Sequence, residues 1–304
     1  MVKIGLVGCG RWGRNILRDL RVLGAGVTVA DTSSESREAA RRLGAESVVD
    51  SLEALPEVDG FVVAAPTTAH GPLVLQLAGT GLPVFCEKPL TADIGAARAI
   101  VAAAGERVFV MDKWRYHGGV RALAAIARSG ELGPVQGVVT RRVGWGCAHA
   151  DVDVVWILLP HDLTIGLEIL GELPRPVSAV AESDERGVLA LAGLLRGTAW
   201  HRFEISARSA SPARSVELRC RDGVATLGGS YDEIIRIERS DAALRGGEPP
   251  PAELRAVDPA LPLYAELEAF VAFVAGRGPA PKSAAAEGAA VVETIAELRA
   301  LAGI

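Results

Sequence analysis

The sequence has few cysteines, and their spacing fits neither a disulfide framework nor a metal site. Only four occur in 304 residues, at Cys9, Cys86, Cys147 and Cys220, and no two of them form a C-x-x-C pair. Disulfide-rich domains and structural zinc sites are recognised by closely spaced cysteines. We therefore expect no metal, no disulfide framework and a reducing compartment.

The chain also lacks an excess of positive charge and a long hydrophobic run. Its formal net charge is −5, from 32 Lys and Arg against 37 Asp and Glu. Nucleic-acid-binding proteins present a basic surface, so no nucleic-acid partner is expected. No apolar run reaches the ~18 residues of a membrane span, and the first residues predict a strand rather than a signal peptide. These absences predict a cytoplasmic protein without a membrane partner.

Two kinds of pattern divide the chain into a predicted first domain at residues 1–116 and a second at residues 117–304. The first alternates continuous apolar strands with amphipathic helices, which predicts a doubly wound parallel sheet of the Rossmann type. The second contains consecutive strands with short turns, which predicts an α+β domain with a mostly antiparallel open sheet. With 49% hydrophobic residues, both domains of this α/β protein can bury a core.

The expected elements follow from these patterns. Strands are predicted at residues 2–7, 27–30, 61–65, 83–86, 108–111, 135–143, 177–182, 188–195, 199–207, 215–221, 224–227 and 233–238. Helices are predicted at residues 15–23, 34–43, 68–78, 92–104, 120–129, 162–170, 263–275 and 284–301. Residues 245–251 form an expected Gly/Pro-rich loop, and the charged residues of the last two helices are expected to form a solvated face.

The most informative motif directly follows the first predicted strand. It reads G-x-G-x-x-G and supplies the predicted cofactor-binding residues Gly8, Gly10, Arg11, Trp12 and Gly13. The first glycine permits a tight turn, the second lets the backbone approach a pyrophosphate, and the third lets helix and strand pack closely. The pyrophosphate would sit at a helix N-terminus. The alternative is a glycine-rich turn in another kind of α/β protein.

Asp31 ends the second predicted strand, about 20 residues after the motif, where an acid hydrogen-bonds a ribose. Its charge favours NAD, because a carboxylate repels the 2′-phosphate of NADP. Ser33 and Arg37 lie close in sequence and would soften that preference, so NADP stays possible.

Two further motifs follow predicted strands of the first domain. Residues 66–70 read P-T-T-A-H and residues 87–89 read E-K-P. The carboxyl ends of strands line the ligand crevice of a doubly wound sheet. Oxidation of an alcohol needs a proton acceptor, and a partly desolvated lysine such as Lys88 can fill that role near neutral pH. The alternative is a salt bridge to Glu87 or a surface charge.

The second domain carries the sequence W-I-L-L-P-H-D at residues 156–162. We expect His161 to open a helix, where the dipole favours its neutral form and a proton-sharing role. The alternative is a capping histidine without substrate contact. Asp162 either orients His161 or interacts favourably with the positive end of the helix dipole. Arg142 is suited to bind a phosphate or a carboxylate; the alternative is an arginine that is only solvated.

Taken together, these motifs resemble the Gfo/Idh/MocA oxidoreductases over essentially the whole chain, and E-K-P is the most specific of them. The opening G-C-G-R-W-G-R-N, with R-x-x-x-G at residues 142–146, W at 156 and P-H-D at 160–162, is similar to bacterial nucleotide-sugar oxidoreductases of that family. Those enzymes oxidise the 3-hydroxyl of UDP-N-acetylglucosaminuronate, and related proteins reduce ketosugars. The resemblance implies catalytic roles for Lys88 and His161 and a cis Lys88–Pro89 bond.

The resemblance also implies binding residues and an assembly. Additional cofactor contacts would come from Pro66, Thr67, His70, Glu87 and Lys88. Substrate contacts would come from Tyr116, Arg142, Trp156, His161 and Asp162. The partner would be a sugar or nucleotide sugar, and the C-terminal sheet would form a homo-dimer or homo-tetramer.

Two positions depart from the family pattern. Many sugar and polyol dehydrogenases of the family have an acid four residues before the histidine, where this chain has Ile157. Asp153 replaces an Asn of the nucleotide-sugar pattern. The prediction is an NAD(P)-dependent oxidoreductase acting on a sugar. The alternatives are an NADPH-dependent ketosugar reductase, a small-sugar or polyol dehydrogenase, and a non-catalytic dinucleotide sensor on the same fold.

Overall fold

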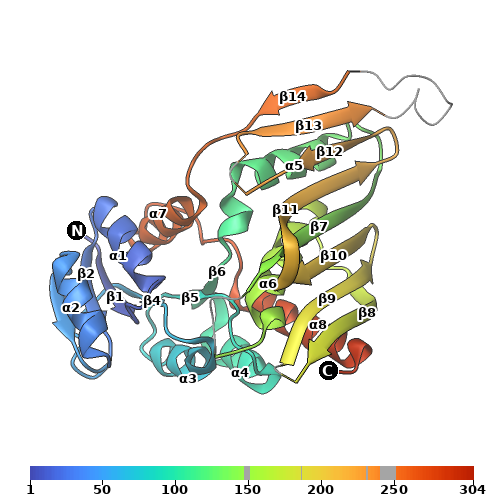
Figure 1. Cartoon of the computed structure of the whole chain (residues 1–304). Coiled ribbons are helices and arrows are strands. Elements are labelled where there is room, and N and C mark those ends of the chain that lie inside the picture. Colours follow the sequence, from blue (N-terminus) through green and yellow to red (C-terminus); the bar gives the residue numbers. More distant parts are fainter. Residues whose placement is uncertain (147–150, 186, 231, 240–250) are drawn as a thin grey trace. The chain divides into compact units, whose positions relative to one another are not determined.

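The computed structural model describes residues 1–146, 151–185, 187–230, 232–239 and 251–304, and the chain forms two compact units (Figure 1). Unit 1 contains residues 1–113 and 261–292, and unit 2 contains residues 114–260 and 293–304. The first boundary lies close to the expected residue 116. The return of residues 261–292 to unit 1 differs from the sequence-based division, which kept them in the second domain.

Unit 1 is built on a six-stranded, fully parallel sheet with the order β3-β2-β1-β4-β5-β6. Its strands are β1 (Lys3–Val7), β2 (Gly26–Ala30), β3 (Ser47–Val49), β4 (Gly60–Val63), β5 (Val84–Glu87) and β6 (Val108–Met111). Its helical segments are α1 (Gly13–Val22), α2 (Ser34–Arg42), α3 (Thr67–Ala78), α4 (Ile94–Ala104), η1 (Gly105–Arg107) and α7 (Pro262–Val274). The order reverses between β1 and β4, which is the switch point of a doubly wound fold.

The core of unit 1 explains why a distant segment completes it. Four of the five residues of β1 are buried, as both faces of a parallel sheet must be covered. On α7, Phe270 stacks on Phe85 of β5 with ring centroids 4.9 Å apart, and Phe273 meets Phe109 of β6 edge-on at 5.2 Å. Helix α7 therefore covers hydrophobic surface of the sheet that the first 113 residues leave open.

Unit 2 is built on an eight-stranded sheet with the order β14-β13-β12-β11-β7-β10-β9-β8. Its strands are β7 (Val135–Trp145), β8 (Arg175–Asp184), β9 (Gly187–Arg196), β10 (Trp200–Ser206), β11 (Arg208–Cys220), β12 (Gly223–Leu227), β13 (Ile234–Arg239) and β14 (Glu253–Ala256). Its helical segments are η2 (Lys113–Tyr116), α5 (Gly118–Ser129), α6 (Val154–Leu170) and the end of α8 (Ala285–Ala302).

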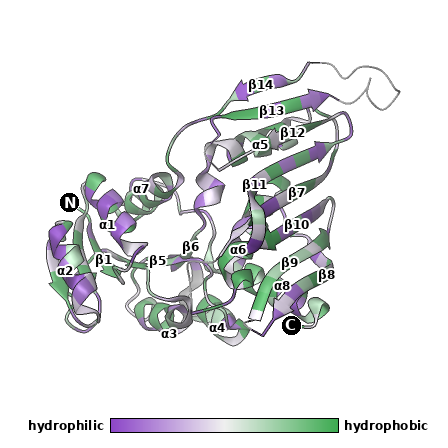
Figure 2. Cartoon of the chain, viewed as in Figure 1, coloured by the Kyte–Doolittle hydropathy of each residue, from purple (hydrophilic) through white to green (hydrophobic). Residues whose placement is uncertain are grey.

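Only β7 and β10 pair in parallel in this sheet, and the other described pairings are antiparallel. Apolar side chains of α5 and α6 pack with those of β7, β11, β12 and β13 in one core. The alternation of hydrophobic and hydrophilic residues along the strands is visible in Figure 2. The predicted α/β class, with a parallel sheet and a mostly antiparallel one, is confirmed.

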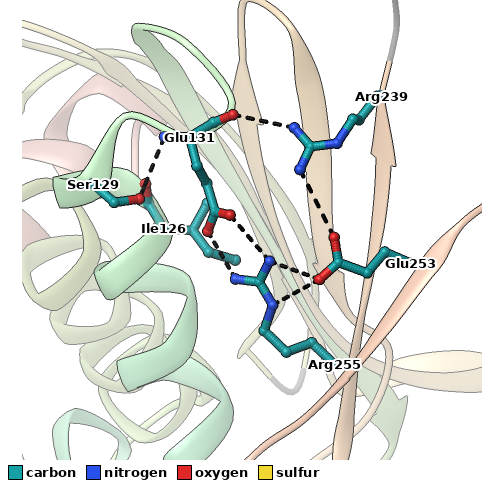
Figure 3. Close-up of polar contacts among 6 residues, drawn as sticks. All are labelled: Ile126, Ser129, Glu131, Arg239, Glu253 and Arg255. Atoms are coloured by element: carbon teal, nitrogen blue, oxygen red, sulfur yellow. Dashed lines mark hydrogen bonds and ion pairs between the residues drawn. The ribbon is translucent and has the colours of Figure 1, made fainter.

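An ion-pair network ties the edge strand β14 and its neighbour β13 to Glu131, two residues after the end of α5 (Figure 3). Arg255 of β14 donates to both carboxylate oxygens of Glu131, at 2.7 and 3.0 Å, and also contacts Glu253 at 2.7 Å. Arg239 of β13 donates to the backbone carbonyl of Glu131 at 3.2 Å. Edge strands are open to unwanted pairing, and charged side chains protect them.

Helix α6 differs from the prediction in a way that changes the candidate site. The expected start was Asp162, but the helix begins at Val154 after the N-cap Asp153, whose side chain accepts the Val155 N–H at 3.0 Å. Pro160 lies inside the helix. His161 is therefore not at a helix N-terminus, and the prediction that the helix dipole favours its neutral form is wrong.

Smaller elements were also missed. Strand β3 has only three residues, none of them fully buried, so it lacks an apolar run. Strand β14 reads E-L-R-A, which is too polar to predict a strand. Residues 245–250 of the expected Gly/Pro-rich loop lie outside the described residues. Among the helices in the described ranges, none is long and apolar enough to cross a bilayer.

Candidate active site

The glycine motif joins β1 to α1, and its three glycines meet different surroundings. Gly8 has φ +94°, and a Cβ there would lie 2.7 Å from the carbonyl oxygen of Ala64. A Cβ on Gly13 would lie 2.4 Å from the carbonyl oxygen of Gly8. A Cβ on Gly10 would meet no atom within 4 Å. The first and third glycines are needed by the fold, whereas Gly10 leaves open space beside the turn.

Asp31, directly after β2, is bonded to the same turn. Its Oδ2 accepts the backbone N–H of Cys9 at 2.7 Å, and its Oδ1 accepts that of Ser33 at 2.8 Å. Arg37 donates to the carbonyl oxygens of Asp31 and Thr32 at 2.9 and 2.8 Å. Burial, reinforced by Asp31, raises the pKa of the Cys9 thiol to about 11. The cysteine of the motif is therefore a protonated packing residue.

A second contact ties the motif to the E-K-P sequence at the end of β5. The indole N–H of Trp12 donates to Oε1 of Glu87, and the backbone N–H of Lys88 donates to Oε2 at 3.2 Å. The Nζ of Lys113, just after β6, lies 4.2 Å from the centroid of a Trp12 ring, within the range of a cation–π interaction. The predicted cis Lys88–Pro89 bond is confirmed.

The P-T-T-A-H segment leads from β4 into α3, with Pro66 as the residue before the helix and Thr67 as its first residue. His70 is 1% exposed, and its two ring nitrogens lie 2.8 Å from the carbonyl oxygen of Pro89 and 2.9 Å from that of Ala65. The imidazole thus links the loop after β4 to the loop after β5. Its predicted contact with a nicotinamide ribose stays a prediction.

In unit 2, Arg142 of β7 and Asp162 of α6 pair with each other. The Nε of Arg142 donates to Oδ2 of Asp162 at 2.7 Å, and their side chains are 7% and 2% exposed. The Arg142 guanidinium also lies 4.7 Å from the centroid of the Trp114 ring. Burial raises the pKa of Asp162, while Arg142 and a hydrogen bond from Thr140 act against that rise.

The remaining predicted residues of unit 2 lie on α6 or next to it. His161 meets the Trp114 ring edge-on, with centroids 6.5 Å apart. Ile157 precedes it by four residues on the same helix, so both lie on one helical face. Trp156 is 9% exposed, and the Arg299 guanidinium of α8 lies 6.0 Å from its ring. Tyr116 ends η2 and is partly buried.

Asp153, at the position where the family pattern has Asn, is also engaged within unit 2. It caps α6, and its Oδ2 accepts a hydrogen bond from Arg299 at 2.6 Å.

The candidate site residues thus form two groups. Unit 1 contains the glycine motif, Asp31, Trp12 and the E-K-P sequence. Unit 2 gathers the residues around His161.

Residues 2–111 match a family model described as an oxidoreductase family with an NAD-binding Rossmann fold, Gfo/Idh/MocA. This match lies within unit 1 and covers about a third of the chain. An inositol 2-dehydrogenase from Rhizobium meliloti is 28% identical over 196 residues, which are 59% of this chain and 58% of that protein. One from Pseudomonas syringae is 35% identical over 144 residues, 43% of each protein. The chain thus spans less than two thirds of these curated relatives.

Solved structures resemble the whole chain. The UDP-N-acetylglucosamine 3-dehydrogenase of Acidithiobacillus ferrooxidans has a TM-score of 0.82 and 22% identity, covering 99% of this chain and 97% of that one. A levoglucosan dehydrogenase in complex with NADH and levoglucosan has a TM-score of 0.85 and 17% identity, with coverages of 99% and 97%. These likenesses show that this chain has the fold of those dehydrogenases.

Several residues of the candidate site were not predicted from the sequence. Lys113 follows β6 and contacts Trp12, and its place after a strand is a signal that could have found it. Glu266 of α7 is 1% exposed; its burial, together with Glu87 and Asp112, raises its pKa, and Lys113 acts against that rise. The expectation that charged residues of the last helices form a solvated face is therefore wrong for Glu266. Trp114 of unit 2 was missed because only tertiary packing brings it to His161.

Proposed function

We propose that this protein is an NAD-dependent oxidoreductase that transfers a hydride between the nicotinamide and a hydroxyl-bearing carbon of a sugar, with a nucleotide sugar as the substrate. The observation that carries the cofactor part is Gly10. Its φ lies outside the left-handed region, and no atom lies within 4 Å of a Cβ built on it. The fold does not need glycine at this position, whereas close approach of a pyrophosphate to the backbone does.

The surroundings of Gly10 fit a dinucleotide. Helix α1 has no side-chain cap and no acid in its first turn, so its N-terminal N–H groups can receive an anion. Asp31 is bonded to the turn through Cys9 and suits a ribose hydroxyl. Gly10, the α1 N-terminus and Asp31 would therefore hold the pyrophosphate and the adenosine ribose of NAD, rather than NADP.

The side chains of the protein have to supply only part of the chemistry. Bound NAD supplies the hydride acceptor. Lys88 then takes the hydroxyl proton, with His161 as the partner that orients or shares it. Lys88 follows β5, and its backbone N–H is bonded to the Glu87 carboxylate, which fixes the residue at the carboxyl edge of the sheet. The ligand crevice of such sheets lies at this edge.

The substrate class rests on the residues around His161. Ile157 occupies the position one helical turn before it, so the acid expected of a polyol dehydrogenase is missing. This favours a nucleotide sugar, the substrate class of the UDP-N-acetylglucosamine 3-dehydrogenase with the same fold. Relatives named inositol 2-dehydrogenase favour the competing substrate, myo-inositol.

The cofactor part is tested with matched alanine substitutions in unit 1. Gly10→Ala should weaken NAD binding in calorimetry by roughly tenfold or more, while thermal stability changes by no more than about 1 kcal/mol. Gly95→Ala, at the second residue of α4 and away from the motif, is the control and should leave the affinity unchanged. Unchanged NAD affinity in Gly10→Ala would refute the cofactor assignment.

The reaction is tested by following NADH formation with UDP-N-acetylglucosamine, UDP-N-acetylglucosaminuronate and myo-inositol. Lys88→Ala and His161→Ala should each lower kcat by roughly 10²-fold or more, with effects that are not additive. NAD affinity should change much less. Turnover of myo-inositol but of neither nucleotide sugar would show that the substrate is the polyol and not a nucleotide sugar. NAD binding without any turnover would favour a dinucleotide sensor.

The assembly is proposed separately. Unit 2 exposes apolar side chains on its sheet: Val180 of β8 is 73% exposed and Trp145 of β7 is 77% exposed. We propose a homo-oligomer formed through this sheet, which light scattering would test. A monomer at micromolar concentration would contradict it.

A further inference from the structure

A buried carboxyl group in unit 1 is not used by the proposed reaction. Glu266 lies in the middle of α7, between Leu263, Leu267 and Phe270, which are core residues. It is 1% exposed, and its Oε2 has no hydrogen-bond partner among the described residues. Burial of an unpaired ionised carboxylate costs a great deal of free energy, so such a group takes up a proton instead.

The groups around Glu266 explain why a proton would stay there. Glu87 at the end of β5 and Asp112 after β6 both disfavour its ionised form, and Lys113 favours it. On α1, which is the helix beside α7 in unit 1 (Figure 1), the buried Asp19 is already paired with Arg18 at 2.7 Å. Burial and the two acids raise the pKa of Glu266 well above its ordinary value.

Glu87 and Glu266 differ in the hydrogen bonds that they receive. Each oxygen of Glu87 accepts an N–H group, one from the Trp12 indole and one from the Lys88 backbone. Hydrogen bonds donated to a carboxylate favour its ionised form. The Oε2 of Glu266 accepts none. Burial raises the pKa of Glu87 as well, but Lys88, Lys113 and these two hydrogen bonds act against that rise. In the cluster of Glu87, Asp112, Lys113 and Glu266, a single proton is therefore held best by Glu266, whose Oε2 accepts no hydrogen bond.

Among the described residues, no three His, Cys, Asp or Glu side chains are arranged to hold a metal ion. The cation beside these acids is Lys113. Trp12 joins the cluster to the cofactor motif, since it belongs to the glycine turn and donates to Glu87. A positive charge brought to the carboxyl edge of β5 would therefore act on Glu87 and, through it, on Glu266.

The oxidised nicotinamide ring carries a positive charge, and the reduced ring carries none. We propose that Glu266 holds a proton in the cofactor-free protein and releases it to solvent when NAD⁺ binds, but keeps it when NADH binds. Glu266 thereby makes the affinity for the oxidised cofactor depend on pH. This inference rests on the proposed NAD-binding function. It adds that the protein distinguishes the oxidised cofactor from the reduced one.

The test measures cofactor affinity against pH. Binding that releases a proton becomes tighter as the pH rises, at most tenfold per pH unit for one proton. Between about pH 6 and pH 8, the Kd for NAD⁺ should fall by roughly fivefold or more. The Kd values for NADH and for ADP-ribose, which lacks the nicotinamide, should stay constant. Calorimetry in two buffers with different ionisation enthalpies should detect proton release with NAD⁺ alone.

Two isosteric variants of α7 show whether Glu266 is the group that releases the proton. Glu266→Gln should abolish the pH dependence and the proton release, while Glu268→Gln, an exposed neighbour on α7, should retain both. Glu266→Gln should also be less sensitive to alkaline pH in thermal unfolding. A carboxyl group whose pKa is raised in the folded state contributes stability at low pH, and this contribution is lost as the pH rises through the folded-state pKa.

The outcomes are distinct. Equal pH dependence for NAD⁺ and NADH would overturn the inference while leaving the NAD-binding function intact. Proton release that persists in Glu266→Gln would also overturn it, because the proton would then come from another group such as Lys88. If Glu266→Gln does not fold, the wild-type comparison of NAD⁺ with NADH and ADP-ribose still decides. Failure of all three ligands to bind would overturn the proposed function and this inference with it.

Discussion

The buried pair of Arg142 and Asp162 allows a quantitative prediction about unit 2. Asp162→Asn removes the negative charge with little change of shape and leaves the Arg142 cation buried, 7% exposed, without a counter-ion. Removing one partner of a buried pair costs about 3–5 kcal/mol, and Asn keeps an acceptor oxygen, so we expect about 3 kcal/mol. For a domain of this size, that loss lowers Tm by roughly 6–12 °C.

The assay is urea unfolding followed by tryptophan fluorescence. Of the five tryptophans, only Trp12 lies in unit 1, so the signal reports mainly on unit 2. The double variant Arg142→Met, Asp162→Leu replaces both charges by apolar groups and should be within about 1 kcal/mol of the wild type. The reasoning would be refuted if Asp162→Asn lowered the free energy of unfolding by less than about 1 kcal/mol. It would also be refuted if the double variant were as unstable as the single variant.

Two further predictions concern charged groups elsewhere. Asp31→Ala should weaken NAD binding by roughly tenfold and narrow the preference for NAD over NADP, because a charged acceptor is lost; stronger NADP binding to the wild type would contradict it. Arg255→Met should destabilise unit 2 by less than about 1 kcal/mol at pH 7, since the pair with Glu131 is partly exposed. The hydrogen bond from Arg255 lowers the pKa of Glu131, so its contribution is present at neutral pH and is lost as the pH falls through that pKa. Urea unfolding at neutral and acidic pH should therefore show a difference between wild type and variant that vanishes in acid.

The parts of the site that sequence could predict are those where one residue type meets a local requirement. Gly8 is needed for a positive φ, and Gly13 for the close approach of α1 to the turn. Such demands leave a recognisable pattern in a few consecutive residues. The same holds for Asp31, whose distance along the chain follows from one strand–helix–strand unit.

The predicted start of α6, after Pro160, lies beyond the actual start at Val154. A better signal was present: Asp153 directly precedes the apolar run and is a favoured N-cap residue. A proline within a helix is costly but tolerated where packing compensates. His161 is consequently held two turns inside a helix, and its properties depend on Trp114 rather than on a helix end.

Pairings between distant elements could not be predicted. Arg142 and Asp162 were each expected to face the substrate, and only the packing of β7 against α6 brings them together. Glu266 had a weak local signal, because it lies three residues after Leu263 and four before Phe270, within the apolar stripe of α7. A charged residue in such a stripe is usually solvated, so its burial required the structure.

The return of the chain to unit 1 has a consequence for biosynthesis. Phe270 and Phe273 cover Phe85 and Phe109, but they are translated after the whole sheet of unit 2. At 5–20 residues per second, the ribosome needs about 10–30 s to pass from the end of β6 to the end of α7. During that interval the aromatic surface of the nascent sheet waits for the helix that covers it, so the hydrophobic core of unit 1 can be completed only after unit 2 has been made.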